Sequence, residues 1–204
     1  MMEQTEREVQ IETAYLILLE EGFAALERAS ARGVKVTLAT NSLASNNHVS
    51  SFVGHRKQRR KLLETGAELF EMRPDAASER ALFTPQELSR YKTVFGLHCK
   101  TAVFDRKQVF VGSFNMDPRS TKLNTEMGFL VESPGLADAV MASIQQNISP
   151  DDSWQVVLLP DGKLAWATRR QREIIIEPDS DPMATRARRA EADLLMPVPD
   201  DSQL

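Results

Sequence analysis

The first third of the chain alternates between short apolar stretches and stretches with a helical period. Such an order is typical of α/β proteins, in which a helix carries the chain back to begin the next parallel strand. Gly33 and Gly66 follow the two helical stretches, as glycines do at helix C-termini. In chain order, the pattern predicts a strand, a helix, a strand, a helix and a strand within residues 8–19, 20–32, 34–40, 55–65 and 67–72. The predicted fold class is therefore α/β, with a mixed, largely parallel β-sheet flanked by helices on both faces.

The pattern changes in the rest of the chain, where short apolar runs are separated by turn residues. Residues 97–104 and 109–112 flank the polar residues 105–108, which predicts a β-hairpin. A Pro-Asp-Gly turn predicts a second hairpin from residues 154–159 and 163–167. The remaining predicted elements are a short helix from residue 85, a strand at 124–131, a helix at 133–147 that begins with a Ser-Pro pair, a strand at 173–177 and a helix at 184–195.

Composition and charge restrict the class of protein. The chain has 204 residues, 42% of them hydrophobic, which is enough for one compact core. Its formal net charge of −4 argues against a general nucleic-acid binder, although residues 55–61 form a basic run. The single cysteine, Cys99, is typical of a reducing compartment, and no apolar run approaches the ~20 residues of a membrane helix. The acidic, polar N-terminus predicts no signal peptide. We therefore expect a cytoplasmic protein, and peripheral contact with the inner membrane stays open.

Residues 97–131 hold the candidate chemistry. In order, the polar and special positions are His98, Lys100, Asp105, Gly112, Ser113, Asn115, Asn124 and Glu126. In a strand, His98 and Lys100 point to one face, and Ser113 and Asn115 leave the end of the hairpin on a common side. An imidazole, an ammonium, a hydroxyl and an amide then converge, and such a set is suited to phosphate.

These residues together predict nucleophilic catalysis at phosphorus. A neutral His98 can attack in line and form a phosphohistidine, while a second, protonated imidazole gives its proton to the leaving oxygen. Lys100, Ser113 and Asn115 would hold the non-bridging oxygens. Glu126 could hydrogen-bond the far ring nitrogen of a histidine and support its charged form. The scheme needs no metal or other cofactor, because the lysine and the imidazolium supply positive charge.

Taken singly, most of these residue types have simpler interpretations. A lone His-x-Lys pair on a strand is usually structural, and Asp105 suits a hairpin turn without any catalysis. We expect His48 to be a surface residue after a polar loop and His55 to lie on the solvated face of a basic helix. Cys99 alternates away from His98, so we expect it in the core rather than as a nucleophile. The full constellation is far more specific than any one of its members.

The spacing H-x-K-x4-D, followed by G-S-x-N, resembles the signature of the phospholipase D superfamily. Residues 33–45, 70–74 and 194–204 are similar to the C-terminal half of bacterial cardiolipin synthase-like members. This resemblance implies phosphatidyl or phosphodiester transfer through a phosphohistidine, with a phosphatidylglycerol-like phospholipid as substrate. By motif position it implies that His98 is a catalytic histidine and that Glu126 partners a histidine. It also implies that Asp105 is a structural member of the catalytic motif. The residues that it implies for phosphate binding are Lys100, Ser113 and Asn115.

The chain carries one such motif, whereas the family members that act on lipids carry two. The resemblance therefore implies a second motif from a homodimer mate or from a partner N-terminal half. Small single-motif relatives that act as nucleases solve this problem by homodimerising. A homodimeric nuclease and a catalytically silent half that only binds phosphate or lipid stay open as alternatives, with nucleic acid less expected. We divide the chain into a catalytic half-domain at 1–150, a β-hairpin extension at 151–178 and a C-terminal tail at 179–204.

Overall fold

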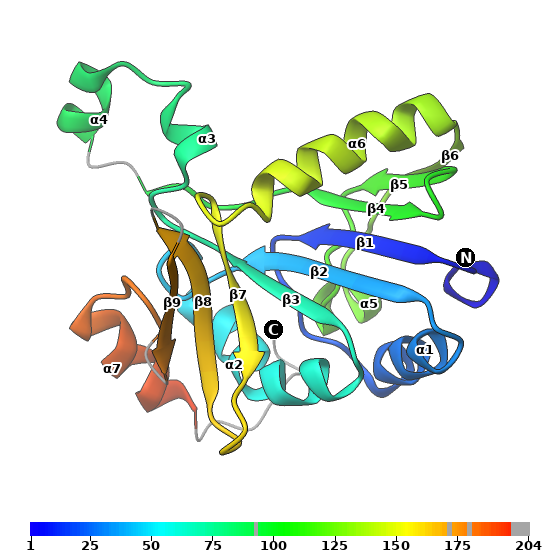
Figure 1. Ribbon diagram of the computed structural model, residues 1–204, viewed down its shortest axis with the longest axis horizontal. Coiled ribbons are helices and arrows are strands. Elements are labelled where there is room, and N and C mark those ends of the chain that lie inside the picture. Colours follow the sequence, from blue (N-terminus) through cyan, green and yellow to red (C-terminus); the bar gives the residue numbers. More distant parts are fainter. Residues whose placement is uncertain (92–93, 171–172, 179–180, 197–204) are drawn as a thin grey trace.

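The computed structural model describes residues 1–91, 94–170, 173–178 and 181–196. Through these residues runs one nine-stranded sheet with the order β6-β5-β4-β1-β2-β3-β7-β8-β9 (Figure 1). In chain order the strands are β1 (Glu8–Thr13), β2 (Lys35–Asn41), β3 (Glu68–Met72), β4 (Lys100–Phe104), β5 (Gln108–Gly112), β6 (Gly128–Glu132), β7 (Ser153–Leu158), β8 (Leu164–Arg170) and β9 (Glu173–Pro178).

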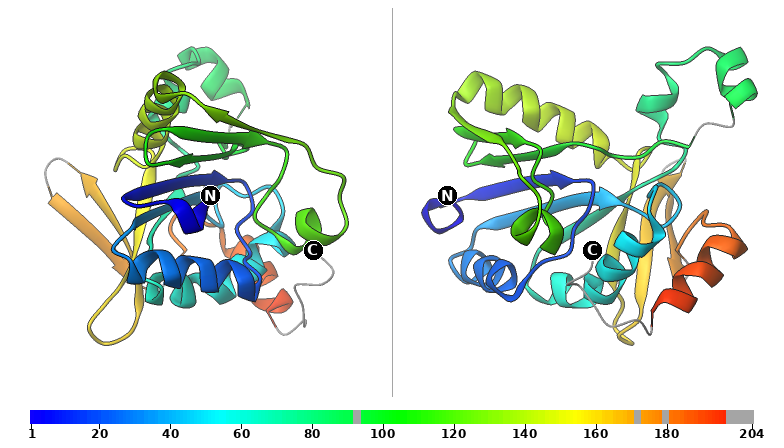
Figure 2. Two further views of the ribbon diagram at one scale, coloured as in Figure 1. Left: turned by 90° about the vertical axis from the view of Figure 1, so that its right-hand side faces the viewer. Right: turned by 180° about the vertical axis from the view of Figure 1, so that it is seen from behind.

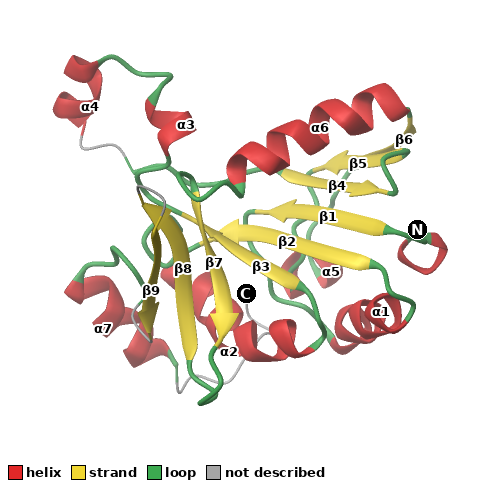
Figure 3. Ribbon diagram, in the orientation of Figure 1, coloured by secondary structure: helices red, strands yellow, loops and turns green. Residues whose placement is uncertain are grey.

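Helices lie on both faces of this sheet (Figure 3). The α-helices are α1 (Glu20–Ala31), α2 (Val49–Glu64), α3 (Ala77–Arg80), α4 (Pro85–Tyr91), α5 (Pro118–Lys122), α6 (Pro134–Asn147) and α7 (Arg186–Leu195), and a short 3₁₀ helix, η1, spans Met2–Gln4. Most predicted strands and helices are confirmed to within a few residues at their ends, but β1 ends six residues before the predicted strand and α2 begins six residues before the predicted helix. The short helices α3 and α5 were not predicted. The α/β fold class is therefore confirmed.

The prediction of a largely parallel sheet is wrong. Only the β1–β2 and β2–β3 pairs are parallel, and the other six described pairs are antiparallel. The β-α-β-α-β rhythm correctly indicates the parallel centre, because a crossover helix returns the chain to the same end of the sheet. The antiparallel pairs come from hairpins and from the β1–β4 and β3–β7 contacts between distant segments. The local pattern does not encode the direction of such distant pairs.

The central strand β1 shows how the two faces are covered (Figure 2). Ile11 packs into the main apolar cluster together with residues of α1. Gln10 and Glu12 point to the opposite face, where Gln145 donates to Gln10 Oε1 at 3.0 Å and Asn147 donates to Glu12 Oε1 at 2.8 Å, both from α6. Successive side chains of a strand point to opposite faces, so one strand anchors both helical layers.

Helix α6 begins as the Ser-Pro pair predicts. The side chain of Ser133 accepts a hydrogen bond from the Leu136 backbone N–H at 3.3 Å, and Pro134 occupies the first turn. This contact satisfies one of the amide groups that every helix N-terminus leaves without a backbone partner. The buried face of the helix is formed by Ala137, Met141 and Ile144.

Replacing Ser133 by alanine should lower the free energy of unfolding by about 1 kcal/mol, because the capping hydrogen bond is lost. Urea denaturation of the variant and the parent measures the difference. Ser143→Ala is the matched control, since Ser143 is exposed within the same helix. We expect this control to leave stability unchanged or slightly raised, because alanine is the better helix former. An equal change in both variants would contradict the capping role of Ser133.

The described part of the C-terminal segment packs against α2. Ala184 and Ala192 join Phe52 and Val53 in a second apolar cluster. Asp181 is buried, and its Oδ1 lies 2.7 Å from Arg59 Nη2. Residues 179–180 and 197–204 of the predicted tail lie outside the described residues, so the predicted boundaries of the extension and the tail remain predictions.

The expectation that His55 lies on a solvated helix face is wrong. Its side chain is 2% exposed, its Nε2 lies 2.8 Å from Glu71 Oε1, and its Nδ1 lies 3.2 Å from the Leu16 carbonyl oxygen. Arg59, four residues further along the same helix face, donates to both Glu71 oxygens at 2.7 and 2.8 Å. Trp166 Nε1 donates to Glu71 Oε2 at 2.9 Å. We call His55, Arg59, Glu71, Trp166 and Asp181 the Glu71 cluster.

Charge pairing within the Glu71 cluster determines the state of its carboxyl group. Burial alone would raise the pKa of Glu71, but the Arg59 guanidinium and the hydrogen-bonded His55 outweigh burial and hold that pKa at about 2. Glu71 is therefore ionised at neutral pH although its side chain is fully buried. The basic run around residue 55 thus supplies the core with countercharge for a strand residue.

Candidate active site

The β4–β5 hairpin and the segment before it carry the first part of the site. β4 begins at Lys100, which pairs with Thr13 of β1, so His98 precedes the strand instead of lying within it. His98 is exposed and Lys100 is half-buried. The turn after β4 bends at Asp105 and Arg106, with φ values of 49° and 55°. Asp105 thus leaves the strand in the left-handed region, which Asp tolerates better than most residues.

Asp105 joins the N-terminal segment to this hairpin. Its carboxylate accepts hydrogen bonds from the backbone N–H groups of Glu6, Arg7 and Glu8, at 2.9, 2.8 and 3.1 Å. Partial burial acts to raise the pKa of Asp105, but these three hydrogen bonds outweigh it and lower that pKa. The contacts hold the start of β1 beside the end of β4, far from His98 along the strand.

His98 and Lys100 lie next to each other at the opposite end of β4. Lys100 Nζ is 3.4 Å from His98 Nδ1 and donates to the His98 carbonyl oxygen at 2.8 Å. Desolvation lowers the pKa of Lys100, and the negative charges of Glu126 and Asp117 oppose this shift. The ammonium group is therefore close enough to Glu126 for the two charges to interact. A cation and an imidazole thus lie side by side where β4 begins.

The prediction that Cys99 belongs to the core is wrong, because Cys99 is exposed. The prediction extended strand alternation through residues 97–104, whereas β4 begins only at Lys100. Cys99 therefore lies before the part of the chain in which alternate side chains enter the core.

The second part of the site follows β5. Ser113 donates from its Oγ to the Glu126 carboxylate and accepts from the Met127 backbone N–H at 3.0 Å. Gly112 stands where β5 and β6 approach closely, since a Cβ there would lie 2.7 Å from Gly128 Cα. This close backbone approach brings Ser113 to Glu126.

Glu126 is held by hydroxyl and amide groups. Besides Ser113, its carboxylate accepts from Ser120 Oγ at 2.9 Å and from Asn124 Nδ2 at 3.0 Å. The hydrogen bonds from Ser113, Asn124 and Ser120 lower the pKa of Glu126, so the group stays ionised in weak acid. Among the described contacts of Glu126 none is to a histidine. A histidine partner for Glu126 therefore remains a prediction.

Asn115 lies on a loop that α5 supports. Its backbone N–H donates to Ser120 Oγ at 3.2 Å, while its own Oδ1 is buried and has no hydrogen-bond partner among the described residues. Asn115 also lines a pocket of about 340 Å³ together with the exposed His48 and Arg119. His48 lies on the surface, as expected. The unpartnered oxygen of Asn115 is an acceptor, so only the amide N–H groups of this side chain could donate to a phosphate oxygen.

Sequence reasoning missed Ser120, which links Asn115 to Glu126. The signal was present, because Asp117 and Pro118 precede it in the pattern of a helix N-cap followed by proline. Asp117 indeed caps α5 and accepts from the Ser120 backbone N–H at 2.6 Å. This cap fixes the turn from which the Ser120 hydroxyl reaches both Asn115 and Glu126.

The site offers one imidazole, one ammonium and a hydroxyl–carboxylate pair, at the end of the sheet where β4 begins and β5 ends. Within residues 1–91, 94–170, 173–178 and 181–196, no group of three or more side chains has the arrangement of a metal site. In the same ranges no helix is long and apolar enough to cross a membrane. The side chains present are suited to binding a phosphate oxygen and to a single attack by His98.

Comparison with known proteins identifies the family of this domain. The family described as "Cardiolipin synthase, PLD-like domain" matches residues 1–148. Cardiolipin synthase C of Escherichia coli K12 is 38% identical over 172 residues, which cover 84% of this chain and 36% of that protein. The chain thus spans about a third of the length of this curated relative.

Two solved structures share the fold at low sequence identity. Nuc of Salmonella typhimurium, a phospholipase D family member, matches 71% of this chain and 79% of its own with a TM-score of 0.50 and 20% identity. The phosphatidylserine synthase of Haemophilus influenzae Rd KW20 matches 72% of this chain and 34% of its own, with a TM-score of 0.54 and 15% identity. These likenesses concern the fold alone.

Proposed function

This chain belongs to the phospholipase D superfamily, as a cardiolipin synthase-type domain, and we propose on that premise that it forms half of a phosphatidyltransferase or phosphodiesterase site. The observation that carries the proposal is the pairing of an exposed His98 with Lys100, whose Nζ lies 3.4 Å from the imidazole Nδ1. The similarity to cardiolipin synthase C supports a phospholipid substrate of the phosphatidylglycerol type.

In the proposed reaction, a ring nitrogen of His98 forms a bond to phosphorus as the bond to the leaving alcohol oxygen breaks. A second imidazole donates a proton to that oxygen and later removes a proton from the incoming alcohol or water. The oxygen of the incoming alcohol or water then attacks phosphorus, which breaks the phosphorus–nitrogen bond and frees His98. Lys100 and Asn115 donate to the non-bridging oxygens, and Ser113 joins them when its single O–H turns from Glu126 to the phosphate. An incoming alcohol gives transfer and water gives hydrolysis.

The second imidazole must come from outside the site described above. Glu126 is hydrogen-bonded only to neutral groups in the described structure and interacts with the charge of the nearby Lys100 ammonium, so its carboxylate can also support an incoming imidazolium. Strand β6, beside it, forms an edge of the sheet and exposes Phe129 and Leu130, and Met127 just before the strand is exposed as well. An unpaired edge with exposed apolar side chains is a typical protein contact surface. We propose that a second copy of this chain covers it and brings a second His98.

The dimer and its activity can be tested together. Sedimentation velocity should give twice the chain mass of 22.9 kDa, and release of glycerol from phosphatidylglycerol should fall as the protein is diluted below its dimer dissociation constant. Phe129→Glu should dissociate the dimer and reduce turnover at least tenfold, because a carboxylate would be buried in the interface. Leu82→Glu is the control, since Leu82 is also exposed but lies in the loop between α3 and α4.

The same measurements separate the alternatives. A monomer that turns over phospholipid at every dilution would contradict the two-copy site. A monomer that becomes active only with a partner half-chain would place the second motif on that partner. Nicking of plasmid DNA that is lost in His98→Ala, without phospholipid turnover, would favour the nuclease. Phosphate binding without a phosphohistidine would favour the silent half.

A further inference from the structure

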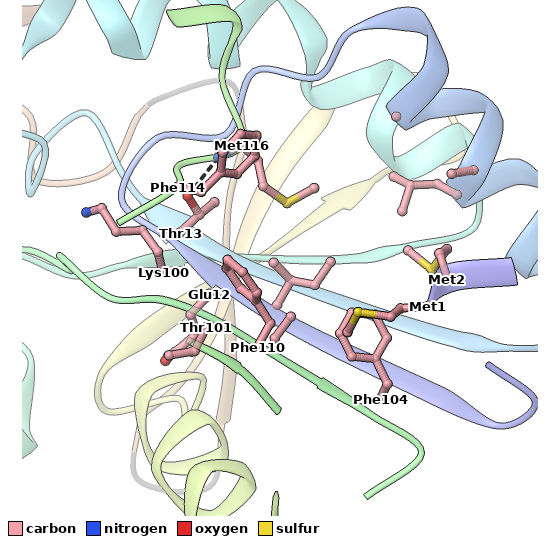
Figure 4. A pocket seen from close by; sticks show the side chains of 15 residues that line it. Met1, Met2, Glu12, Thr13, Lys100, Thr101, Phe104, Phe110, Phe114 and Met116 are labelled. Carbon is pink, nitrogen blue, oxygen red and sulfur yellow. Dashed lines mark hydrogen bonds between the residues drawn. The ribbon is translucent and has the colours of Figure 1, made fainter. Parts of the chain in front are cut away.

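An apolar pocket of about 270 Å³ adjoins the candidate active site (Figure 4). It lies between helix α1 and the face of the sheet that α1 covers. Both strands of the β4–β5 hairpin contribute to its wall. The apolar pocket is lined mainly by Ile11, Leu26, Phe104, Phe110, Phe114 and Met116. Ligand pockets of this kind are mostly apolar, with a few polar groups placed at the opening.

One end of the apolar pocket meets the phosphate site. Lys100 contributes its carbon stem to the wall, and its nitrogen points away from the pocket in Figure 4. Met1 and Met2 stand at the other end (Figure 4). From Lys100 to Phe104 the pocket follows four residue steps of β4, which amounts to about 13 Å of strand. A narrow apolar space thus begins directly behind a cation.

Phe114 links the apolar pocket to the proposed phosphate ligands. It lines the pocket, while its immediate neighbours Ser113 and Asn115 are the hydroxyl and amide of the phosphate site. A ligand with a phosphate and an alkyl chain would therefore meet both parts of its site on one loop. This continuity distinguishes the pocket from an unrelated gap in the core.

Glycine positions keep the apolar pocket open. Gly22 on α1 lines it without a side chain. A Cβ at Gly128 would collide with the Phe110 ring, so the glycine lets that ring lie flat across β6 and form part of the pocket wall. The position of the Phe110 ring in the pocket wall thus depends on the missing side chain at Gly128.

We propose that the apolar pocket receives one alkyl chain of an amphiphilic phosphate ester whose phosphate is held at Lys100. The inference rests on the proposed function and specifies its substrate as a lipid with a chain buried in the protein. A volume of about 270 Å³ holds roughly nine groups of water size, at about 30 Å³ each, and a methylene is of similar size. The pocket therefore accommodates roughly nine methylenes.

Calorimetric titration with monoalkyl phosphates from ethyl to dodecyl, each below its micelle concentration, tests this proposal. The affinity should rise by roughly fourfold for each added methylene and then level off near nine. The heat-capacity change of binding should become more negative over the same range. An affinity independent of chain length would overturn the proposal. A rise that continues unchanged to dodecyl would also overturn it, because it would indicate unspecific partitioning.

A pair of variants on α1 tests the location. Ala25 lines the apolar pocket and Ala24 does not, so Ala25→Leu fills the space while Ala24→Leu adds the same side chain outside it. Ala25→Leu should weaken decyl phosphate binding by on the order of tenfold to a hundredfold, the contribution of about three methylenes, and leave ethyl phosphate unaffected. Ala24→Leu should behave like the parent. Equal chain-length profiles in all three proteins would overturn the assignment of the chain to this pocket.

Failure of this inference and failure of the proposed function give different results. The titrations need no turnover, so a chain-length profile in an inactive protein would support the apolar pocket and count against the enzyme. Turnover of phosphatidylglycerol together with an affinity that does not depend on chain length would support the proposed enzyme. It would exclude the apolar pocket as the binding site of an alkyl chain. If Ala25→Leu proves unfolded by circular dichroism, the plateau in the parent protein still decides the proposal.

Discussion

Replacing His98 by asparagine should reduce phosphodiester turnover by about four orders of magnitude or more, since no other imidazole is placed to take over the attack on phosphorus. His55 is buried against Glu71, and His48 lies at the start of α2. Asparagine keeps a polar side chain of similar reach, so binding of the phosphate should persist. Turnover of a chromogenic phosphodiester and neutral-pH mass spectrometry of the phosphoenzyme measure the two effects.

The matched control for His98→Asn is Cys99→Ser. Cys99 is the adjacent residue and is exposed, and its thiol has no place in the proposed reaction. We expect Cys99→Ser to keep turnover within about twofold of the parent, as surface substitutions normally do. If His98→Asn retained turnover within tenfold, or still gained the mass of a covalent phosphoryl group with its remaining ester substituent, His98 would not be the nucleophile.

Arg59→Met should lower the free energy of unfolding by about 3–5 kcal/mol. The substitution leaves the fully buried Glu71 without its guanidinium partner, and it also removes the 2.7 Å ion pair to Asp181. A buried charge that loses its partner keeps its desolvation cost and loses its compensation. Arg60→Met is the control, because Arg60 is exposed at the next position of α2 and, among the described residues, donates to the Gly162 carbonyl oxygen. Its effect should stay below about 1 kcal/mol.

The pH dependence of this difference follows from the low pKa of Glu71. In the folded protein that pKa is about 2, against an ordinary value of 4.5, so the ionised form stabilises folding above pH 4.5. This contribution, on the order of 3 kcal/mol, is lost as the pH falls from 4.5 toward 2. Denaturation curves of the parent and Arg59→Met should therefore differ most near neutral pH and converge in acid. A difference that is constant from pH 7 to pH 3 would contradict the role of the Glu71 charge.

Features determined by neighbouring residues could be predicted from the sequence. The Ser133–Pro134 start of α6 and the polar turn between β4 and β5 depend on capping and turn chemistry within a few positions. The direction of the β3–β7 pair could not be predicted, because it joins residues about eighty positions apart. The burial of His55 and Arg59 depends in the same way on Glu71, a carboxylate between the apolar residues Phe70 and Met72 of β3, which was the available signal.

The candidate site divides along the same line. The spacing of His98, Lys100 and Ser113 indicated a phosphate site, because these residues lie on one hairpin and its continuation. The apolar pocket could not be predicted, since its wall is assembled from β1, α1 and β5, which meet only in the folded sheet. The strand alternation that placed Cys99 in the core failed because β4 begins at Lys100, the residue after Cys99.

The position of β1 in the sheet has a consequence for synthesis on the ribosome. β1 is the earliest strand in the chain, yet it lies between β2 and β4, and Thr13 finds its antiparallel partner only at Lys100. At about 5–20 residues per second, a nascent chain would present one open edge of β1 for roughly 4–17 s. The Asp105 carboxylate, which binds the N–H groups of Glu6, Arg7 and Glu8, emerges just behind β4 and secures the late strand once it has paired. During that interval the backbone groups of β1 that later pair with β4 have no strand partner.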